Sequence, residues 1–222
     1  MTGFVIGIDV QVARECPFAV LDMTTSRVVQ TGWLSGDNLA EKVRALSATY
    51  EDATFAIDAP RMPLTSPRKW YWRNAKGWMC GSGSEKGLGR HCEVVIKAYS
   101  LANPQWTPLA EQAPDWMKLG FKIFETLEGR SLTLEVFPSA TYRMLHHEGG
   151  TRVEIPLAGF LPGPKDMLDA IVAALTGAEF LAGRGQEVGG GDGFGTIVLP
   201  RKLSEEESSV LMWPGTPAFR IE

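Results

Sequence analysis

The segment Lys165–Thr176, which reads KDMLDAIVAALT, constrains the fold more than any other stretch of the chain. Its apolar residues spread around more than one face of a helix, which is typical of a helix packed inside a core. Pro164 precedes it, and proline is well tolerated at a first helical position. Asp166 and Asp169 lie three residues apart on neighbouring parts of this helix. Because a buried carboxylate is costly unless it is paired or binds a metal, Asp169 needs partners from elsewhere.

The first part of the chain predicts a mixed β-sheet. Apolar or alternating runs at Phe4–Asp9, Pro17–Met23 and Arg27–Leu34 are joined by short links, which indicates three antiparallel strands. An amphipathic helix over Asn38–Tyr50 follows, and then an apolar strand over Ala53–Asp58. A strand that follows a helical crossover joins such a sheet in parallel.

The composition changes at Arg61. Proline, glycine, tryptophan and basic residues crowd together, and Arg61–Lys97 contains eight basic residues against two acidic ones. We expect a single domain over 1–222, with an insertion over about 61–130 and a C-terminal extension over about 183–222. Gly183–Gly195 is dense in glycine and is expected to be mobile, and a strand is expected over Thr196–Leu199.

Three predicted strands carry a carboxylate at or near the C-terminal end, namely Asp9, Asp58 and Glu135 in the strand Ser131–Phe137. Functional sites in sheets with crossover helices gather beyond such strand ends. Together with Asp169, four carboxylates would converge, and their mutual repulsion would require hard cations. Oxygen ligands suit Mg²⁺ or Mn²⁺, and two such ions support phosphodiester hydrolysis. Taken singly, each strand-end acid is better explained by the turn that follows it, and only the convergence of all four favours a functional site.

The ordered motifs FVIGID, FAIDAP, GRHCE, LEVFPSAT and KDMLDAIVAALT resemble the family catalogued as domain of unknown function 429, whose members are predicted RNase H-like nucleases. The resemblance runs from Phe4 to Thr176, and the basic insertion and the C-terminal tail match less well. LDAIVAALT is also similar to the last helix of resolvase-type enzymes of the RNase H fold, whose Asp-Ala pair supplies a metal ligand.

This resemblance implies an α/β, RNase H-like fold: a five-stranded mixed sheet, its first three strands antiparallel, with helices on both faces. It implies that Asp9, Asp58 and Asp169 are catalytic metal ligands on the first strand, the fourth strand and the last helix. Glu135 would be a further acidic member. The expected cofactor is Mg²⁺ or Mn²⁺, and the expected activity is hydrolysis of nucleic acid.

Substrate contacts are expected from basic residues. Arg90 would grip a phosphate with its planar guanidinium, oriented by Glu93, and Arg61 and Lys165 are further candidates. Trp70, Tyr71, Trp72 and Trp78 alternate with basic residues, a pattern that suits single-stranded nucleic acid. The alternatives are a surface salt bridge for Arg90, a solvated Lys165, and aromatic residues that pack the insertion onto the sheet.

Composition narrows the class of protein. The formal net charge of −4 argues against a protein that coats nucleic acid. It does not exclude an enzyme that binds nucleic acid through one local basic patch. No apolar run is long enough to span a membrane, and MTGFVIGIDV has no positive n-region or cleavage site, so we expect a cytoplasmic protein. The rivals to a nuclease are a non-catalytic binding module and an actin-like phosphotransferase, although no glycine-rich phosphate hairpin follows Asp9.

Overall fold

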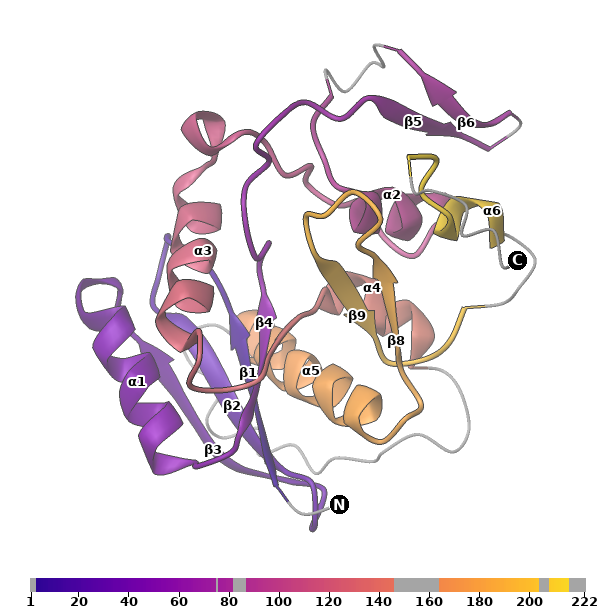
Figure 1. Cartoon of the computed structure of the whole chain (residues 1–222). Helices are drawn as coiled ribbons and strands as arrows, with labels where there is room; N and C mark the ends of the chain where they lie inside the picture. Colours follow the sequence, from indigo (N-terminus) through magenta and orange to yellow (C-terminus); the bar gives the residue numbers. More distant parts are fainter. Residues whose placement is uncertain (1–2, 75, 82–86, 146–163, 204–207, 216–222) are drawn as a thin grey trace.

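The computed structural model describes residues 3–74, 76–81, 87–145, 164–203 and 208–215. At its centre lies a five-stranded mixed sheet with the strand order β3-β2-β1-β4-β7 (Figure 1). The strands β1 (Phe4–Asp9), β2 (Cys16–Asp22) and β3 (Arg27–Leu34) are antiparallel neighbours. The strands β4 (Thr54–Asp58) and β7 (Thr133–Glu135) extend the sheet in parallel with β1. The prediction of a mixed sheet with three antiparallel first strands is confirmed.

Helices cover both faces of this sheet, and the alternation of side chains along β1 separates the two layers. Ile6 and Ile8 share a core with α1 (Leu39–Thr49) and α3 (Asp115–Leu127). Val5 belongs instead to the core on the face covered by α5 (Pro164–Leu181). Figure 1 shows α1 and α3 on one side of the sheet and α5 on the other. The face on which a strand residue lies therefore decides which helix it meets.

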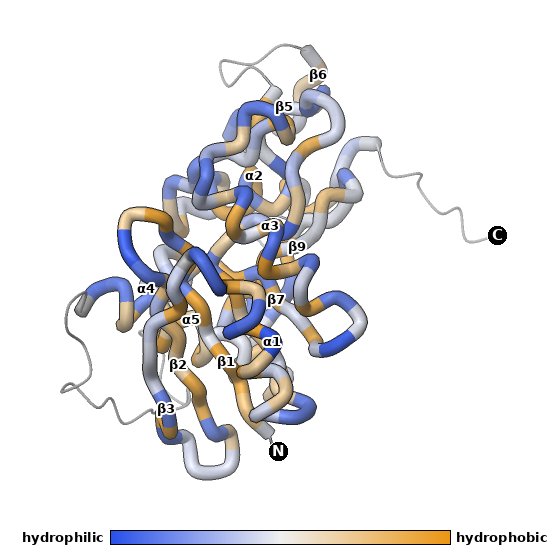
Figure 2. Tube along the Cα trace, turned by 90° about the vertical axis from the view of Figure 1, so that its left-hand side faces the viewer, coloured by the Kyte–Doolittle hydropathy of each residue, from blue (hydrophilic) through white to orange (hydrophobic). Residues whose placement is uncertain are grey.

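The helix α5 approaches the sheet unusually closely, because small residues meet at the contact. A Cβ atom added to Gly7 would lie 1.9 Å from the Ala170 carbonyl oxygen and 2.5 Å from the Ala174 nitrogen. Further along α5, a Cβ on Gly177 would lie 2.9 Å from a methyl group of Val5. The start of α5 therefore lies over the C-terminal end of β1, and this position brings Asp169 close to that strand end. Figure 2 shows hydrophobic colouring along β1, β2 and α5.

The remaining elements pack together around a separate hydrophobic core beyond the C-terminal ends of β4 and β7. A core cluster there includes Cys92, Val95, Ala140, Val188 and Ile197. It joins elements that are far apart in the sequence: the hairpin β5 (Trp70–Arg73) and β6 (Gly77–Cys80), α2 (His91–Ala98), α4 (Pro138–Met144), the hairpin β8 (Gln186–Gly189) and β9 (Thr196–Leu199), and α6 (Ser208–Leu211). Two short 3₁₀ turns lie at Gly36–Asn38 and Ala110–Gln112.

The later part of the chain contains one expected strand and one that was not expected. The strand expected at Thr196–Leu199 is confirmed as β9, and its partner β8 falls within Gly183–Gly195, where a mobile segment was expected. The helix α3 lies within the expected insertion but packs against the central sheet. Across the described ranges, no helix combines the length and apolar character needed to cross a bilayer.

Candidate active site

Asp9 and Asp58 stand side by side at the C-terminal ends of two neighbouring parallel strands. They are register partners in the β1–β4 ladder, so both side chains lie on the same face of the sheet. Counting back from each by two residues gives Gly7 and Ala56, which both meet α5. The two carboxylates therefore point toward the layer of α5. No hydrogen bond or ion pair from another described residue reaches either carboxylate.

Burial and neighbouring carboxylates shift the pKa values of this pair. Burial, followed by repulsion from Asp169, raises the pKa of Asp9 to about 7. The pKa of Asp58 is raised well above its ordinary value by burial and then by repulsion from Asp9 and Asp169. Lys165 lowers both values. Asp169 on α5 thus lies close enough to Asp9 and Asp58 to influence the ionisation of both.

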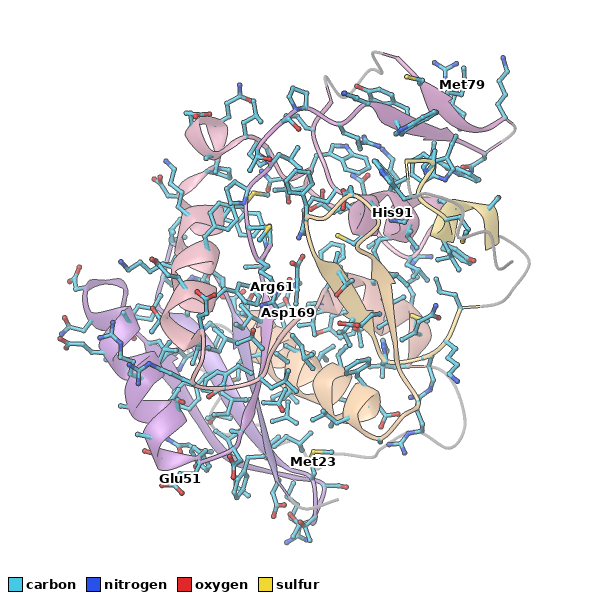
Figure 3. All side chains as sticks on the ribbon, in the orientation of Figure 1. Met23, Glu51, Arg61, Met79, His91 and Asp169 are labelled. Carbon is cyan, nitrogen blue, oxygen red and sulfur yellow. The ribbon has the colours of Figure 1, made fainter. Side chains whose placement is uncertain are left out.

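Asp169 is held from two sides. The Tyr142 hydroxyl donates a hydrogen bond to Oδ1 at 2.7 Å, and the Lys165 ammonium lies 2.5 Å from Oδ2. The Asp169 residue is 8% exposed, whereas the Lys165 side chain is 77% exposed. The hydrogen bond to Asp169 also raises the pKa of Lys165. Figure 3 marks Asp169 at the start of α5, near the centre of the molecule. Its neighbour Asp166 pairs separately with Arg14 at 3.3 Å.

We expect Asp9→Asn to raise the melting temperature by a few degrees at pH 8 without divalent metal. Because the pKa of Asp9 rises from 3.8 to about 7 on folding, its stabilising contribution is complete below about pH 3.8 and is lost as the pH rises through about 7. The neutral amide removes the repulsion that remains at pH 8, so the gain should vanish toward pH 4. Thermal unfolding at the two pH values measures it.

Asp22→Asn is the matched control for this measurement, since Asp22 also ends a strand. Its pKa is lowered by hydrogen bonds from Thr25 and Thr24, so its charge is favourable in the folded state. Asp22→Asn should leave the melting temperature unchanged or reduce it at pH 8. A loss of stability in Asp9→Asn would contradict a repulsive aspartate cluster.

Glu135 lies on the opposite face of the sheet from the three aspartates. It is the register partner of Ile57, which belongs to the core under α1 and α3, and not of Asp58. Its carboxylate accepts hydrogen bonds from both terminal nitrogens of Arg90 and from the backbone N–H of Arg61. The sequence predicts that Glu135 joins the aspartates as a metal ligand, but in the structure both of its carboxylate oxygens accept hydrogen bonds in this buried network.

Arg90 is the centre of that network and is 1% exposed. Its Nε donates to Glu93 at 2.9 Å, and its Nη1 donates to Glu135 at 2.8 Å and to the Phe194 carbonyl at 3.2 Å. Glu93 also accepts hydrogen bonds from the Thr107 hydroxyl and backbone N–H. Burial alone would lower the pKa of Arg90, but the two carboxylates hold it well above its usual range. This guanidinium joins β7, α2 and the β8–β9 hairpin.

Arg61, a second expected phosphate contact, is also used internally. Its guanidinium donates to the Thr133 hydroxyl at 2.9 Å and to the Thr133 carbonyl at 2.6 Å, and it stacks over Phe124 at 4.5 Å. The backbone and side chain of Arg61 therefore both tie the loop after β4 to β7. Figure 3 labels Arg61 close to the C-terminal end of β4.

A cleft of about 380 Å³ opens beside Asp58, and the Arg90 network forms part of its wall. Ligand pockets are typically about 300–1,000 Å³, so this cleft has room for a nucleotide-sized group. Its lining combines acidic, aromatic and small residues: Val10, Asp58, Ala59, Pro60, Arg90, Glu93, Asn103, Pro104, Gln105, Trp116, Glu135, Val136, Phe137, Ser139 and Ile197.

The chemistry of the aspartates fits a hard divalent cation, because the donors are all oxygen and the charge is in excess. Among the described residues, nothing hydrogen-bonds or ion-pairs with the carboxylates of Asp9 and Asp58, while Asp169 is engaged by Tyr142 and Lys165. Within the described ranges, no three His, Cys, Asp or Glu side chains are grouped closely enough to hold a metal ion. A bound cation would therefore require Asp169 to exchange Lys165 for the metal.

Two contributors to these clusters were not anticipated from the sequence. Tyr142 is 27 residues from Asp169, and Thr107 is 14 residues from Glu93. Both contacts depend on tertiary packing, and a tyrosine or threonine carries no spacing signal for such a role. Comparison with known proteins finds no match for this chain: no family model, no curated protein and no solved structure.

Proposed function

We propose that this chain is an RNase H-like nuclease that hydrolyses phosphodiester bonds of nucleic acid with Mg²⁺ or Mn²⁺. One observation carries the proposal: Asp9 and Asp58 lie in register at the ends of parallel strands, unpaired among the described residues, and interact electrostatically with Asp169 on α5. The mixed sheet, with three antiparallel strands followed by two parallel ones, agrees with that fold.

In this proposal Asp9, Asp58 and Asp169 hold the cation through carboxylate oxygens. The bound cation would activate water and stabilise the charge that develops on the phosphate oxygens. Lys165 carries its positive charge at the solvent edge of the same site, where it would attract the phosphate of the substrate. The cleft beside Asp58 would receive the nucleotide adjoining the cleaved bond.

Arg90, Arg61 and Glu135 have supporting roles in this scheme. Since the Arg90 and Arg61 side chains are hydrogen-bonded within the protein, we assign them to positioning and not to substrate contact. Glu135 accepts the Arg61 backbone N–H at 2.8 Å and so fixes the loop that begins directly after Asp58. Glu135 would thereby hold Asp58 in place without contacting the metal.

The test is cleavage of labelled single-stranded RNA, single-stranded DNA and hybrid duplex in the presence of Mn²⁺. We expect cleavage of at least one substrate and a fall of more than about 100-fold in Asp58→Asn. Asp22→Asn, which changes a strand-end aspartate outside the site, should cleave at the rate of the unaltered protein. Absence of metal-dependent cleavage while Mn²⁺ binds would contradict the proposal.

Replacing Lys165 separates metal binding from catalysis. Lys165→Met removes the ammonium that competes for Asp169, so Mn²⁺ should bind about two- to five-fold more tightly. Cleavage should nevertheless slow, because the charge that attracts the phosphate is lost. Calorimetry and cleavage rates measure the two effects. Lys118→Met removes an exposed lysine from a surface pair and should change neither. Weaker Mn²⁺ binding in Lys165→Met would contradict the claim that the Lys165 ammonium and the metal compete for Asp169.

The contact between Lys165 and Asp169 also favours a second candidate function. An ammonium that neutralises the third aspartate allows the fold to persist without metal, as a binding module for nucleic acid or protein would need. For such a module, Asp58→Asn would leave binding intact and no substrate would be cleaved. The cleavage experiment therefore distinguishes the two.

A further inference from the structure

A second cavity of about 180 Å³ lies between the β5–β6 hairpin, the start of α2 and the β8–β9 loop. It is smaller than pockets that enclose a whole drug-sized ligand, which suits part of a larger molecule. The described residues that line it include three aromatic, two basic and one acidic side chain: Leu64, Ser66, Pro67, Arg68, Lys69, Trp70, Gly89, Asp192, Phe194 and Trp213.

Three aromatic side chains face this cavity, and each is half-buried: Trp70, Phe194 and Trp213. The ring of Trp213 packs against those of Trp78 and His91, whose centroids lie 5.1 Å and 5.2 Å away. In the described part of the chain, neither Trp70 nor Phe194 pairs with another ring. The rings that line the cavity thus present flat apolar surfaces on which a flat ligand can stack.

Among the described residues that line the cavity, Arg68 and Asp192 are fixed by hydrogen bonds, whereas Lys69 offers an available positive charge. Arg68 is 7% exposed, and its guanidinium donates to the carbonyls of Leu88 and Trp70. The Asp192 carboxylate accepts the backbone N–H of His91 at 2.7 Å and that of Phe194 at 3.1 Å. Lys69 is exposed, and its ammonium has no ion pair with another described residue. An aromatic pocket with a lysine at its edge matches a base and its phosphate.

The cavity adjoins the candidate active site. Phe194 lines it, while the carbonyl of the same residue accepts the hydrogen bond from Arg90, which lines the cleft beside Asp58. Gly89, directly before Arg90, lines the second cavity as well. The two spaces therefore lie on either side of the backbone at Gly89–Arg90 and at Phe194.

We propose that this cavity binds an unpaired nucleobase of a single-stranded nucleic acid, with an adjoining phosphate on Lys69. The inference rests on the proposed function and names its substrate class. A base within a duplex is stacked on both neighbours and paired along one edge, so it would have to leave the helix to enter. The cavity therefore selects single strands over duplexes.

The test measures binding of a fluorescent single-stranded oligonucleotide and of the matching duplex, without metal, to the full chain carrying Asp58→Asn. We expect tighter binding of the single strand. Trp70→Ala should weaken it by about 5- to 150-fold, which corresponds to the loss of one stacked base. Trp70→Phe keeps a stacking face and should retain most of the affinity. Lys69→Met should reduce the salt dependence by roughly one phosphate contact.

Met79→Ala is the matched control, because Met79 lies on β6 of the same hairpin, at the edge of the molecule in Figure 3, and does not line the cavity. It should bind the single strand as tightly as the parent, and Trp70→Ala should melt at the parent's temperature. Equal affinity for single strand and duplex, or unchanged affinity in Trp70→Ala, would overturn the inference. If Trp70-dependent binding is found without metal-dependent cleavage, the inference stands and the nuclease proposal fails.

Discussion

Gly7→Ala is expected to reduce the free energy of unfolding by about 3 kcal/mol, because its new methyl group would collide with the backbone of α5. The added carbon would lie 1.9 Å from the Ala170 oxygen and 2.5 Å from the Ala174 nitrogen. Backbone atoms cannot rotate away as a side chain can, so the helix itself must shift. Urea denaturation measures the loss. The same shift moves Asp169 away from Asp9, so metal-dependent activity should fall even in the folded fraction.

Gly177→Ala is the matched contrast on the same interface. There the added carbon would lie 2.9 Å from a γ-methyl group of Val5, which can shift by a small side-chain rotation, and 3.2 Å from the Ala56 Cβ. Alanine also favours the helix over glycine by about 1 kcal/mol, which offsets part of the crowding. We therefore expect a smaller loss than for Gly7→Ala. Equal stability of Gly7→Ala and the unaltered protein would contradict the close approach of α5 to β1.

Arg90→Met is expected to reduce the free energy of unfolding by about 3–5 kcal/mol. The substitution preserves the apolar stem but leaves the buried carboxylates of Glu93 and Glu135 without their cation. It also removes the hydrogen bond that holds the Phe194 carbonyl of the β8–β9 hairpin. Urea denaturation at pH 7 measures this effect. A loss of less than about 1 kcal/mol would contradict the claim that Arg90 stabilises the fold by neutralising Glu93 and Glu135.

Lys118→Met provides the control for this prediction. Lys118 pairs with Asp115 at 3.4 Å, and both side chains are more than half exposed. An exposed ion pair contributes only about 0–1 kcal/mol, because water screens the charges. The contrast with Arg90→Met therefore isolates the effect of burial. Arg90→Lys should recover part of the stability, since it restores the charge without the forked geometry.

Local patterns predicted much of the fold. The runs at Phe4–Asp9 and Ala53–Asp58 became β1 and β4, because each combines apolar residues with a strand-ending acid. The helix expected from Lys165 became α5, since its apolar residues surround the axis. These elements bring Asp9, Asp58 and Asp169 to the same end of the sheet, although within the described ranges the three carboxylates are not grouped closely enough to hold a metal ion. The sequence does not indicate why residue 7 is glycine, because the backbone that a side chain there would meet belongs to α5, which is distant in the sequence.

Long-range pairing limits what the sequence can predict about the site. Glu135 ends its strand as Asp58 does, but a register in which Glu135 meets Ile57 places it on the other face. A shift of one residue in register would have reversed that placement. Arg90 meets Glu135 over 45 residues and Phe194 over 104, distances at which spacing carries no signal. Arg90 and Arg61 therefore could not be recognised as buried structural cations.

The glycine-dense segment shows a similar limit. Such a composition is typical of a mobile loop, but several of these glycines meet a neighbour directly. A Cβ on Gly189 would lie 2.4 Å from the Cys92 Cβ, and one on Gly191 would lie 2.2 Å from the Trp213 Cβ. Gly189 also has a φ of 91°, which favours glycine. These glycines allow the β8–β9 hairpin to pack against α2.

The most direct test of the account is a crystal of this protein soaked in Mn²⁺, with anomalous diffraction measured to locate the metal. We expect a peak in contact with the carboxylates of Asp9 and Asp58, with Asp169 turned from Lys165 toward the ion. The same experiment on Asp58→Asn should give a weaker peak or none. Bound Mn²⁺ elsewhere, with these three carboxylates unoccupied and Lys165 still paired with Asp169, would contradict the proposed metal site.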